Sequence, residues 1–203
     1  MTTTIIFDFG DVFINLNKEG AYTNALKLFG LKEFPEELVA INNLYEQGLM
    51  ETDEFLDFYK ENFTNLSRQE IIDAWNFIIL DFPKHRLEWL QELKASGNYK
   101  LLLLSNTNEL HIDYIKVNVS FYEDFKVCFD KFYLSHEINF RKPDESIFNF
   151  VLNDNNLKAG ECVFIDDTKE NTDSAFNLGF NTWNNDPKTQ DVVDLFKLKP
   201  HLF

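Results

Sequence analysis

Two patterns of hydrophobic residues divide the chain. A short apolar run, TIIFDF, occupies residues 4–9, and from Asn17 to about Ala95 the apolar residues recur at helical spacing. From Tyr99 onward, short continuous apolar runs alternate with amphipathic segments, a pattern typical of strands that alternate with helices. The sequence therefore predicts a block of helices inserted after the first strand of an α/β sheet.

The inserted block carries several signals of helix ends. Gly30 and Gly48 each follow an amphipathic segment, where glycine commonly takes the left-handed conformation that ends a helix. Ser67 and Glu70 have the spacing of a capping box at a helix start. Thr52 precedes the acidic first turn of another segment, so we expect it to be an N-cap.

Four later apolar runs complete the predicted sheet. They are continuous rather than alternating, which favours strands covered on both faces. These strands are expected at residues 99–105, 131–135, 162–166 and 180–183. The intervening helices are expected near residues 109–116, 145–153 and 170–178. The expected fold class is an open α/β sheet of about five parallel strands, which binds its ligands beyond the carboxyl ends of the strands.

Composition restricts the classes of partner. The chain has 203 residues, of which 44% are hydrophobic, and this fits one globular domain or one domain with an insert. Its 34 acidic and 19 basic residues give a net charge of -15, and there is no basic run. Nucleic acid is therefore not expected as a partner, since binding a phosphate backbone needs clustered Lys and Arg. An anionic ligand would need a few local cations or a metal ion.

No part of the sequence has the pattern of a targeting signal or a membrane span. The start, MTTTIIFDFGD, lacks a charged leader region, and no apolar stretch approaches the roughly 20 residues of a transmembrane helix. We expect a cytoplasmic protein with no membrane partner. Cys128 and Cys162 are too few for a disulfide framework and are expected to be buried thiols. The oligomeric state is left open.

Polar residues follow three of the predicted strands at the point where each ends. Asp8 follows the first, Ser105 ends the second, and Asp166 and Asp167 end the fourth. Each alone could be only a turn or cap residue. Because the carboxyl ends of parallel strands share one edge of the sheet, we expect these groups to converge on one site, together with Lys142 before a later helix. Adjacent carboxylates on a buried strand repel each other unless a cation or donors hold them.

Four short motifs in the right order carry a family resemblance. They are FDFGDV (7–12), LLLSNTN (102–108), RKP (141–143) and FIDDTKENTDSA (164–175). With them the chain resembles the haloacid dehalogenase (HAD) superfamily of aspartate-nucleophile hydrolases over nearly its whole length. YEQGLMETDEF and YLSHEINFRKP are most similar to the subfamily I branch that includes bacterial glucose-1-phosphate phosphatases and the phosphatase domain of epoxide hydrolases.

The resemblance implies a fold and a domain organisation. The core would be a Rossmann-like parallel sheet, the HAD-like core, formed by residues 1–16 and 96–203. Residues 17–95 would form an inserted all-helical cap of the C1 type. This division agrees with the change of hydrophobic pattern along the chain.

The resemblance also implies roles for individual residues. It makes Asp8 the catalytic nucleophile, which attacks phosphorus and forms a transient aspartyl phosphate. Asp8, the backbone carbonyl of Gly10 and Asp167 would bind Mg²⁺, the implied cofactor. Asp166 would lie beside the metal site, and Asn171 would steady the lysine or a metal-bound water.

The remaining motif residues would bind the phosphoryl group. Ser105 and the amide of Asn106 would hold its oxygens, and Lys142 would neutralise the charge that develops on them. Arg141 is a further candidate cation. The expected partner is a small-molecule phosphate ester, such as a sugar phosphate.

Gly10 departs from the family pattern. Phosphatases of this superfamily commonly carry a second Asp there, which protonates the leaving oxygen and then activates water. The nearest acid is Asp11, whose side chain is expected to point in a different direction. Asp11 is thus either the displaced acid or a turn residue. If the acid is missing, hydrolysis of substrates with good leaving groups, such as an anomeric sugar phosphate, would be slowed least. Asn139 replaces a glycine before the RKP motif and tolerates the left-handed conformation.

Two other functions compete with a Mg²⁺-dependent phosphatase. A 2-haloacid dehalogenase uses the same nucleophile without metal, but a metal-free site for a carboxylate substrate is not expected to keep Asp166 and Asp167 beside Asp8. A non-catalytic binding protein of this fold is compatible with Gly10, although the set of motif residues is otherwise complete. We therefore expect a phosphatase, whose substrate the sequence does not identify.

Overall fold

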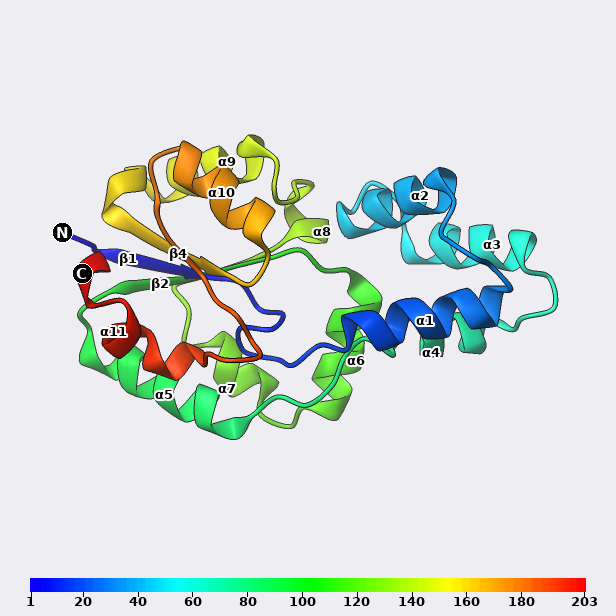
Figure 1. Ribbon diagram of the computed structural model, residues 1–203, viewed down its shortest axis with the longest axis horizontal. Helices are drawn as coiled ribbons and strands as arrows, with labels where there is room; N and C mark the ends of the chain where they lie inside the picture. The colour runs from blue at the N-terminus through cyan, green and yellow to red at the C-terminus, as the bar shows by residue number, and fades with distance from the viewer.

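A single parallel sheet forms the centre of the α/β part of the molecule, on the left of Figure 1, in a computed structural model that describes residues 1–203. Its strands are β1 (Thr4–Phe7), β2 (Lys100–Ser105), β3 (Lys131–Leu134), β4 (Cys162–Asp166) and β5 (Asn181–Asn184). They lie in the order β3-β2-β1-β4-β5, and every pair is parallel. The predicted Rossmann-like α/β class is confirmed. The strand order reverses between β1 and β4, and this switch point is where such sheets bind ligands.

Helices cover both faces of the sheet and join its strands. After β2 they are α6 (Glu109–Asn118), α7 (Tyr122–Lys126), α8 (Ser135–Ile138), α9 (Glu145–Asn155), α10 (Lys169–Asn177) and α11 (Leu195–Leu198). Short 3₁₀ turns are η1 (Ala159–Glu161), η2 (Val192–Asp194) and η3 (Pro200–Leu202). In Figure 1, α9 and α10 lie above the sheet, whereas α7 and α11 lie below it.

Alternate side chains of the central strands enter two separate cores. Ile5 and Phe7 of β1 belong to a cluster of 25 buried residues, while Ile6 between them belongs to a cluster of 11 that includes Phe148 of α9. Successive side chains of a strand point to opposite faces. Both faces of β1 therefore need apolar residues, and this explains its continuous hydrophobic run.

Four helices form a separate cluster, which we call the cap, on the right of Figure 1. They are α1 (Lys18–Phe29), α2 (Glu36–Glu46), α3 (Thr52–Asn62) and α4 (Arg68–Asn76). The cap has a hydrophobic core of its own, in which Tyr45 and Phe55 stack with their ring centroids 4.1 Å apart. Because this core is separate from those of the sheet, the cap is a distinct layer of packing.

The fifth helix of the inserted block, α5 (Lys84–Ser96), does not belong to the cap. Its residues Leu87, Leu90 and Leu93 are buried in the large core cluster on one face of the sheet. The predicted cap, residues 17–95, therefore extends too far along the chain. The hydrophobic pattern of α5 resembles that of the cap helices before it in the chain. The two differ only in the surface against which they pack.

The predicted helix starts are confirmed in one case and wrong in another. Ser67 and Glu70 form the capping box of α4, with both hydrogen bonds present. The N-cap of α3 is Glu51 rather than Thr52, and Glu51 forms a capping box with Glu54. Glu51 carries a side-chain acceptor one position earlier, so Thr52 becomes the first helical residue.

Two further expectations concern the whole chain. Cys128 and Cys162 are buried free thiols, as predicted. None of the helices combines the length and the apolar character needed to cross a bilayer.

Candidate active site

Two carboxylate side chains lie side by side at the switch point of the sheet, where β1 and β4 end. Phe7 of β1 pairs with Ile165 of β4, and the backbone N–H of Asp8 donates to the Ile165 carbonyl at 2.8 Å. Asp166 follows Ile165, so it lies next to Asp8. Asp166 is fully buried and Asp8 is 8% exposed. The parallel pairing thus brings together two acids that are far apart in the sequence.

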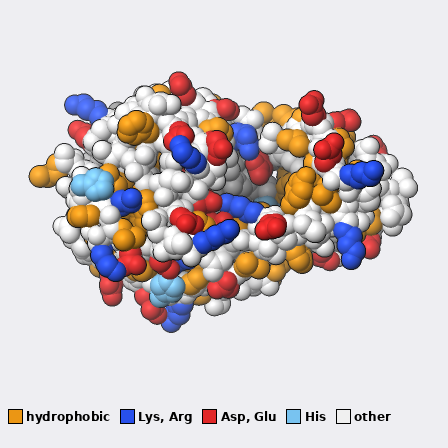
Figure 2. Space-filling model, viewed as in Figure 1, with side chains coloured by type: hydrophobic (Ala, Val, Ile, Leu, Met, Phe, Trp, Pro, Cys, Tyr) orange, Lys and Arg blue, Asp and Glu red, His pale blue; other side chains and the backbone are white.

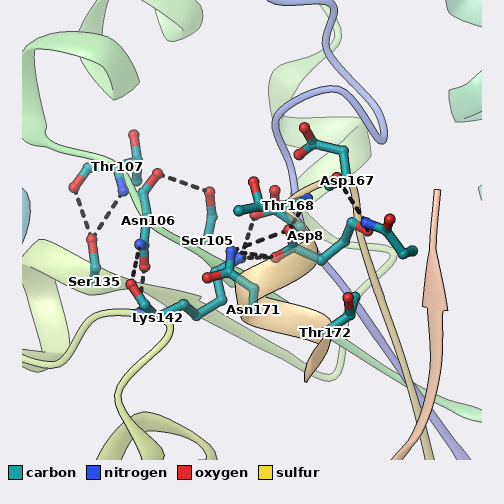
Figure 3. A network of polar contacts seen from close by, with 12 residues as sticks. Asp8, Ser105, Asn106, Thr107, Ser135, Lys142, Asp167, Thr168, Asn171 and Thr172 are labelled. Carbon is teal, nitrogen blue, oxygen red and sulfur yellow. Dashed lines mark hydrogen bonds and ion pairs between the residues drawn. The ribbon is translucent and has the colours of Figure 1, made fainter. Parts of the chain in front are cut away.

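Lys142 joins these two acids. Its Nζ lies 2.7 Å from Asp8 Oδ1 and 2.6 Å from Asp166 Oδ2, and the lysine is 1% exposed (Figure 3). Burial lowers the pKa of Lys142, but the two carboxylates outweigh it and hold the pKa above its usual value. Lys142 therefore remains a cation in the interior, where a charge is tolerated only when it is paired.

The loop that carries Lys142 is tied to the end of β2. The side-chain amide of Asn106 donates to the Lys142 carbonyl at 2.8 Å, and the Lys142 N–H donates to Asn106 Oδ1 at 2.9 Å (Figure 3). The Asn106 side chain thus positions the lysine backbone. Because the side chain of Asn106 is used in this way, only the backbone N–H of Asn106 is available to bind a phosphoryl oxygen. Asn139, just before this loop, has the left-handed conformation that the sequence predicted, with φ 60°.

Asp166 has hydrogen-bond partners on both carboxylate oxygens. It accepts from the Thr168 N–H at 2.8 Å and from Asn171 Nδ2 at 3.1 and 3.0 Å, besides its contact with Lys142. The predicted contact of Asn171 with the lysine is indirect, because it passes through Asp166. These bonds suit Asp166 to positioning Lys142 rather than to binding a metal.

Three carboxylates are close enough to share a cation. One oxygen from each of Asp8, Asp166 and Asp167 lies within 4.8 Å of the others. Burial, together with the charges of Asp166 and Asp167, raises the pKa of Asp8 to about 7 in spite of Lys142, and burial also raises the pKa of Asp167. Carboxylate oxygens are the ligands that Mg²⁺ prefers. Asp8 and Asp167 therefore fit as Mg²⁺ ligands, with Asp166 beside them, and the negative charge of the three acids favours a cation.

Lys18, at the start of the cap, also contacts this acidic group. Its Nζ lies 2.5 Å from Asp167 Oδ2 and 3.0 Å from Asp11 Oδ2. The other oxygen of Asp11 accepts from the Leu16 N–H at 2.9 Å, and Asp11 has φ 54°. Both oxygens of Asp11 are thus bound, one by the backbone after β1 and the other by Lys18 of the cap. Its role as the displaced acid stays a prediction.

A cavity of about 410 Å³ opens between the core and the cap, and Figure 2 shows the surface hollowed there. Most of the site residues expected from the sequence line it. They are Asp8, Gly10, Ser105, Asn106, Arg141, Lys142, Asp167 and Asn171. Asp11 and Asp166 do not line it. The cavity therefore joins the acidic cluster to a space that is large enough for a small metabolite.

The structure adds residues that the sequence analysis missed. Ser135 accepts from the Thr107 N–H at 2.9 Å (Figure 3). It also donates to the Glu46 carbonyl at 2.5 Å, so it ties the loop after β2 to the cap. Ser135 directly follows a strand, as Asp8 does, so the same rule could have found it. Glu46 and His111 line the cavity, but no sequence signal places the cap over the core.

His111 of α6 contacts the cap through one ring nitrogen and its own helix start through the other. Nε2 lies 3.1 Å from the Trp75 carbonyl of α4, and Nδ1 lies 3.1 Å from Asn108 Nδ2. Burial lowers the pKa of His111 to about 4. The ring is therefore neutral near pH 7, with the proton on Nε2 and the acceptor on Nδ1.

Comparisons with known proteins agree with this geometry. A family model described as haloacid dehalogenase-like hydrolase matches residues 2–179. A D-ribitol-5-phosphate phosphatase of Bacteroides thetaiotaomicron is 29% identical over 193 residues, which cover 90% of this chain and 91% of that protein. A HAD family enzyme from the same organism, crystallised as a magnesium complex, is 34% identical with a TM-score of 0.84, over 97% of this chain and 98% of its own.

A second solved structure is comparably similar. A predicted HAD-like family hydrolase from Porphyromonas gingivalis is 28% identical with a TM-score of 0.84, over 98% of each chain. An L-2-haloacid dehalogenase that is 15% identical, with a TM-score of 0.61, shares the fold alone. The family model covers most of the sequence, and the resemblance found in the four motifs is confirmed. The chain belongs to the haloacid dehalogenase-like hydrolase family.

Proposed function

We propose that this hydrolase is a Mg²⁺-dependent phosphatase that removes phosphate from a small phosphorylated metabolite of the sugar or polyol class. The observation that carries the proposal is the contact between Asp8 and Lys142 at 2.7 Å, in which a buried carboxylate and a buried cation meet at the end of an open cavity. The similarity to a D-ribitol-5-phosphate phosphatase supports the substrate class.

The charges of the cavity support a metal requirement. Four carboxylates and three cationic side chains line it: Asp8, Glu46, Asp167, Glu170, Lys18, Arg141 and Lys142. The lining alone is therefore net negative and would repel a phosphate dianion. Asp8, Asp167 and the Gly10 carbonyl would hold Mg²⁺, which when bound neutralises charge on the phosphoryl oxygens.

The residues of the chain have separate tasks in the reaction. A carboxylate oxygen of Asp8 attacks phosphorus, the bond from phosphorus to the ester oxygen breaks, and the leaving alkoxide takes a proton from solvent water in the open cavity. Lys142 neutralises the charge on the phosphoryl oxygens, while the Ser105 hydroxyl and the Asn106 N–H donate to them. Water then attacks the phosphorus of the aspartyl phosphate, which releases inorganic phosphate and restores Asp8.

The test is a panel of phosphorylated sugars and polyols assayed for phosphate release with Mg²⁺ and with EDTA, alongside chloride release from 2-chloropropionate. We expect phosphate release only with Mg²⁺. Asp8→Asn should lower turnover by roughly 10³-fold or more, as loss of a covalent nucleophile does. The exposed acid Asp154, changed to Asn, is the control and should retain turnover.

Three results would overturn the proposal. They are phosphate release in EDTA at the rate seen with Mg²⁺, chloride release in place of phosphate release, and full activity of Asp8→Asn. The second of these would instead support the dehalogenase alternative.

A further inference from the structure

We infer that Glu46 and Arg141 form a paired acceptor and donor that recognises hydroxyl groups of the leaving group, so that the preferred substrate is a polyhydroxylated phosphate ester. The inference rests on the proposed phosphatase function and assigns specificity to two residues of the same cavity.

The pair bridges the two walls of the cavity. Glu46 is the last residue of α2 on the cap, and Arg141 directly precedes Lys142 on the core. Arg141 Nη2 lies 3.0 Å from Glu46 Oε2, and both side chains line the cavity. Because Arg141 adjoins Lys142 in the chain, the pair lies next to the residue that contacts the nucleophile.

Both members keep hydrogen-bonding capacity that the protein does not use. The hydrogen bond between them uses only Nη2 of Arg141 and one oxygen of Glu46. Arg141 Nη1 has no partner in the protein and, unlike the buried Nε, is not enclosed, so an acceptor from a ligand can bind there. A hydroxyl group both donates and accepts. Neighbouring hydroxyls can therefore bind the free Glu46 oxygen and the free Arg141 nitrogen together.

The backbone of Glu46 is fixed in place by the core. Ser135 Oγ donates to the Glu46 carbonyl at 2.5 Å, and Asn139 Nδ2 donates to the carbonyls of Gln47 and Gly48 at 3.1 and 3.0 Å. The backbone that carries the Glu46 carboxylate is thus held in place by hydrogen bonds from the core. Such preorganisation reduces the entropy that binding would otherwise cost.

Other polar groups of the cavity are less suited to this task. Both ring nitrogens of His111 already have partners, and Lys18 is paired with Asp11 and Asp167. Glu170 is exposed. Glu46 and Arg141 are half-buried, at 28% and 26% side-chain exposure, so a ligand that reaches them would be shielded from water.

The test compares kcat/KM for a polyol phosphate, D-ribitol 5-phosphate, with kcat/KM for 4-nitrophenyl phosphate, which has no hydroxyls. We expect Glu46→Leu to lower kcat/KM on the polyol phosphate by about tenfold or more, as the loss of a charge-assisted hydrogen bond does, and to change kcat/KM on the aryl phosphate by less than about threefold. Arg141→Met also removes a cation from the cavity, so we expect it to lower kcat/KM on both substrates, but on the polyol phosphate by about tenfold more. Gln47→Ala is the matched control, because Gln47 Nε2 donates to the Asn139 carbonyl across the same junction but does not line the cavity. It should leave the ratio of the two substrates unchanged.

A binding measurement separates this inference from the proposed function. In the Asp8→Asn background with Mg²⁺, calorimetry should show tighter binding of ribitol 5-phosphate than of inorganic phosphate, and Glu46→Leu should abolish the difference. Equal binding of the two ligands, or an equal fall on both substrates in the kinetic comparison, would overturn the inference. If no phosphate ester is hydrolysed, the proposed function fails, and this binding difference still decides the role of the pair.

Discussion

Lys142 balances the charges of the buried site. It is 1% exposed and lies between Asp8 and Asp166, at 2.7 and 2.6 Å. A buried ion pair contributes little net stability, but removing one partner leaves an uncompensated charge in the interior. The same lysine therefore serves the fold and the proposed chemistry.

Replacing Lys142 should affect stability and activity together. Lys142→Met keeps the length of the side chain and leaves two carboxylates without their cation, so we expect the free energy of unfolding to fall by about 3–5 kcal/mol and phosphatase turnover to be lost. Urea denaturation measures the first effect. Lys131→Met removes the exposed pair with Asp154, at 3.1 Å, and should cost no more than about 1 kcal/mol. Equal losses for the two variants would show that the buried cation has no special role.

Individual site residues differ in how well the sequence predicts them. Asp8, Ser105 and Asp167 could be predicted because each lies at or just after the carboxyl end of a buried strand, and parallel strands bring these ends to one edge. Lys18 and Glu46 could not be predicted, because they contribute only through the placement of the cap over the core. That placement depends on side-chain contacts between distant segments, which hydrophobic periodicity does not encode.

Helices and strands were predictable where the local pattern determines them. The continuous apolar runs identified β2 and β4, because strands buried on both faces need such runs. The pattern did not assign α5 to the sheet, since an amphipathic helix shows which face is buried but not what it packs against. The cap boundary was therefore misplaced although the helix itself was expected.

Gly48 lies at the junction between the cap and α8, and Gly30 at the end of α1 provides a comparison. Gly48 and Gly30 both have φ +67°, so alanine should cost each about 1–2 kcal/mol through the left-handed conformation alone. A Cβ on Gly48 would lie 2.0 Å from the His136 carbonyl oxygen, whereas nothing lies within 4 Å of a Cβ on Gly30. We expect Gly48→Ala to cost roughly 1–3 kcal/mol more than Gly30→Ala, as overpacking does. Thermal unfolding of the two variants measures the difference.

Activity of the same two variants tests whether this junction holds the cap in place. Gly48 lies two residues after Glu46, so a displaced backbone should also lower kcat/KM on the polyol phosphate. Gly30→Ala should retain it. Equal stability and activity of the two variants would contradict the close packing of Gly48 on His136.

At the scale of the whole molecule, a chain of net charge -15 is proposed to bind an anionic substrate. Within the cavity between core and cap, Lys142 and Arg141 lie beside Asp8 and Asp167, the carboxylates that fit Mg²⁺, so positive charge can be gathered locally around an anion. The acidic surface elsewhere opposes binding of polyanions. A small phosphate ester is therefore the anion best suited to this molecule.

The central claim is that Asp8 accepts the phosphoryl group, and acid quenching during turnover tests it most directly. With a phosphate ester labelled on phosphorus and with Mg²⁺ present, we predict protein-bound label that is stable in acid and released by hydroxylamine, as expected of an acyl phosphate. Asp8→Asn should carry none. Turnover without bound label in the wild type, or label that persists in Asp8→Asn, would contradict the account.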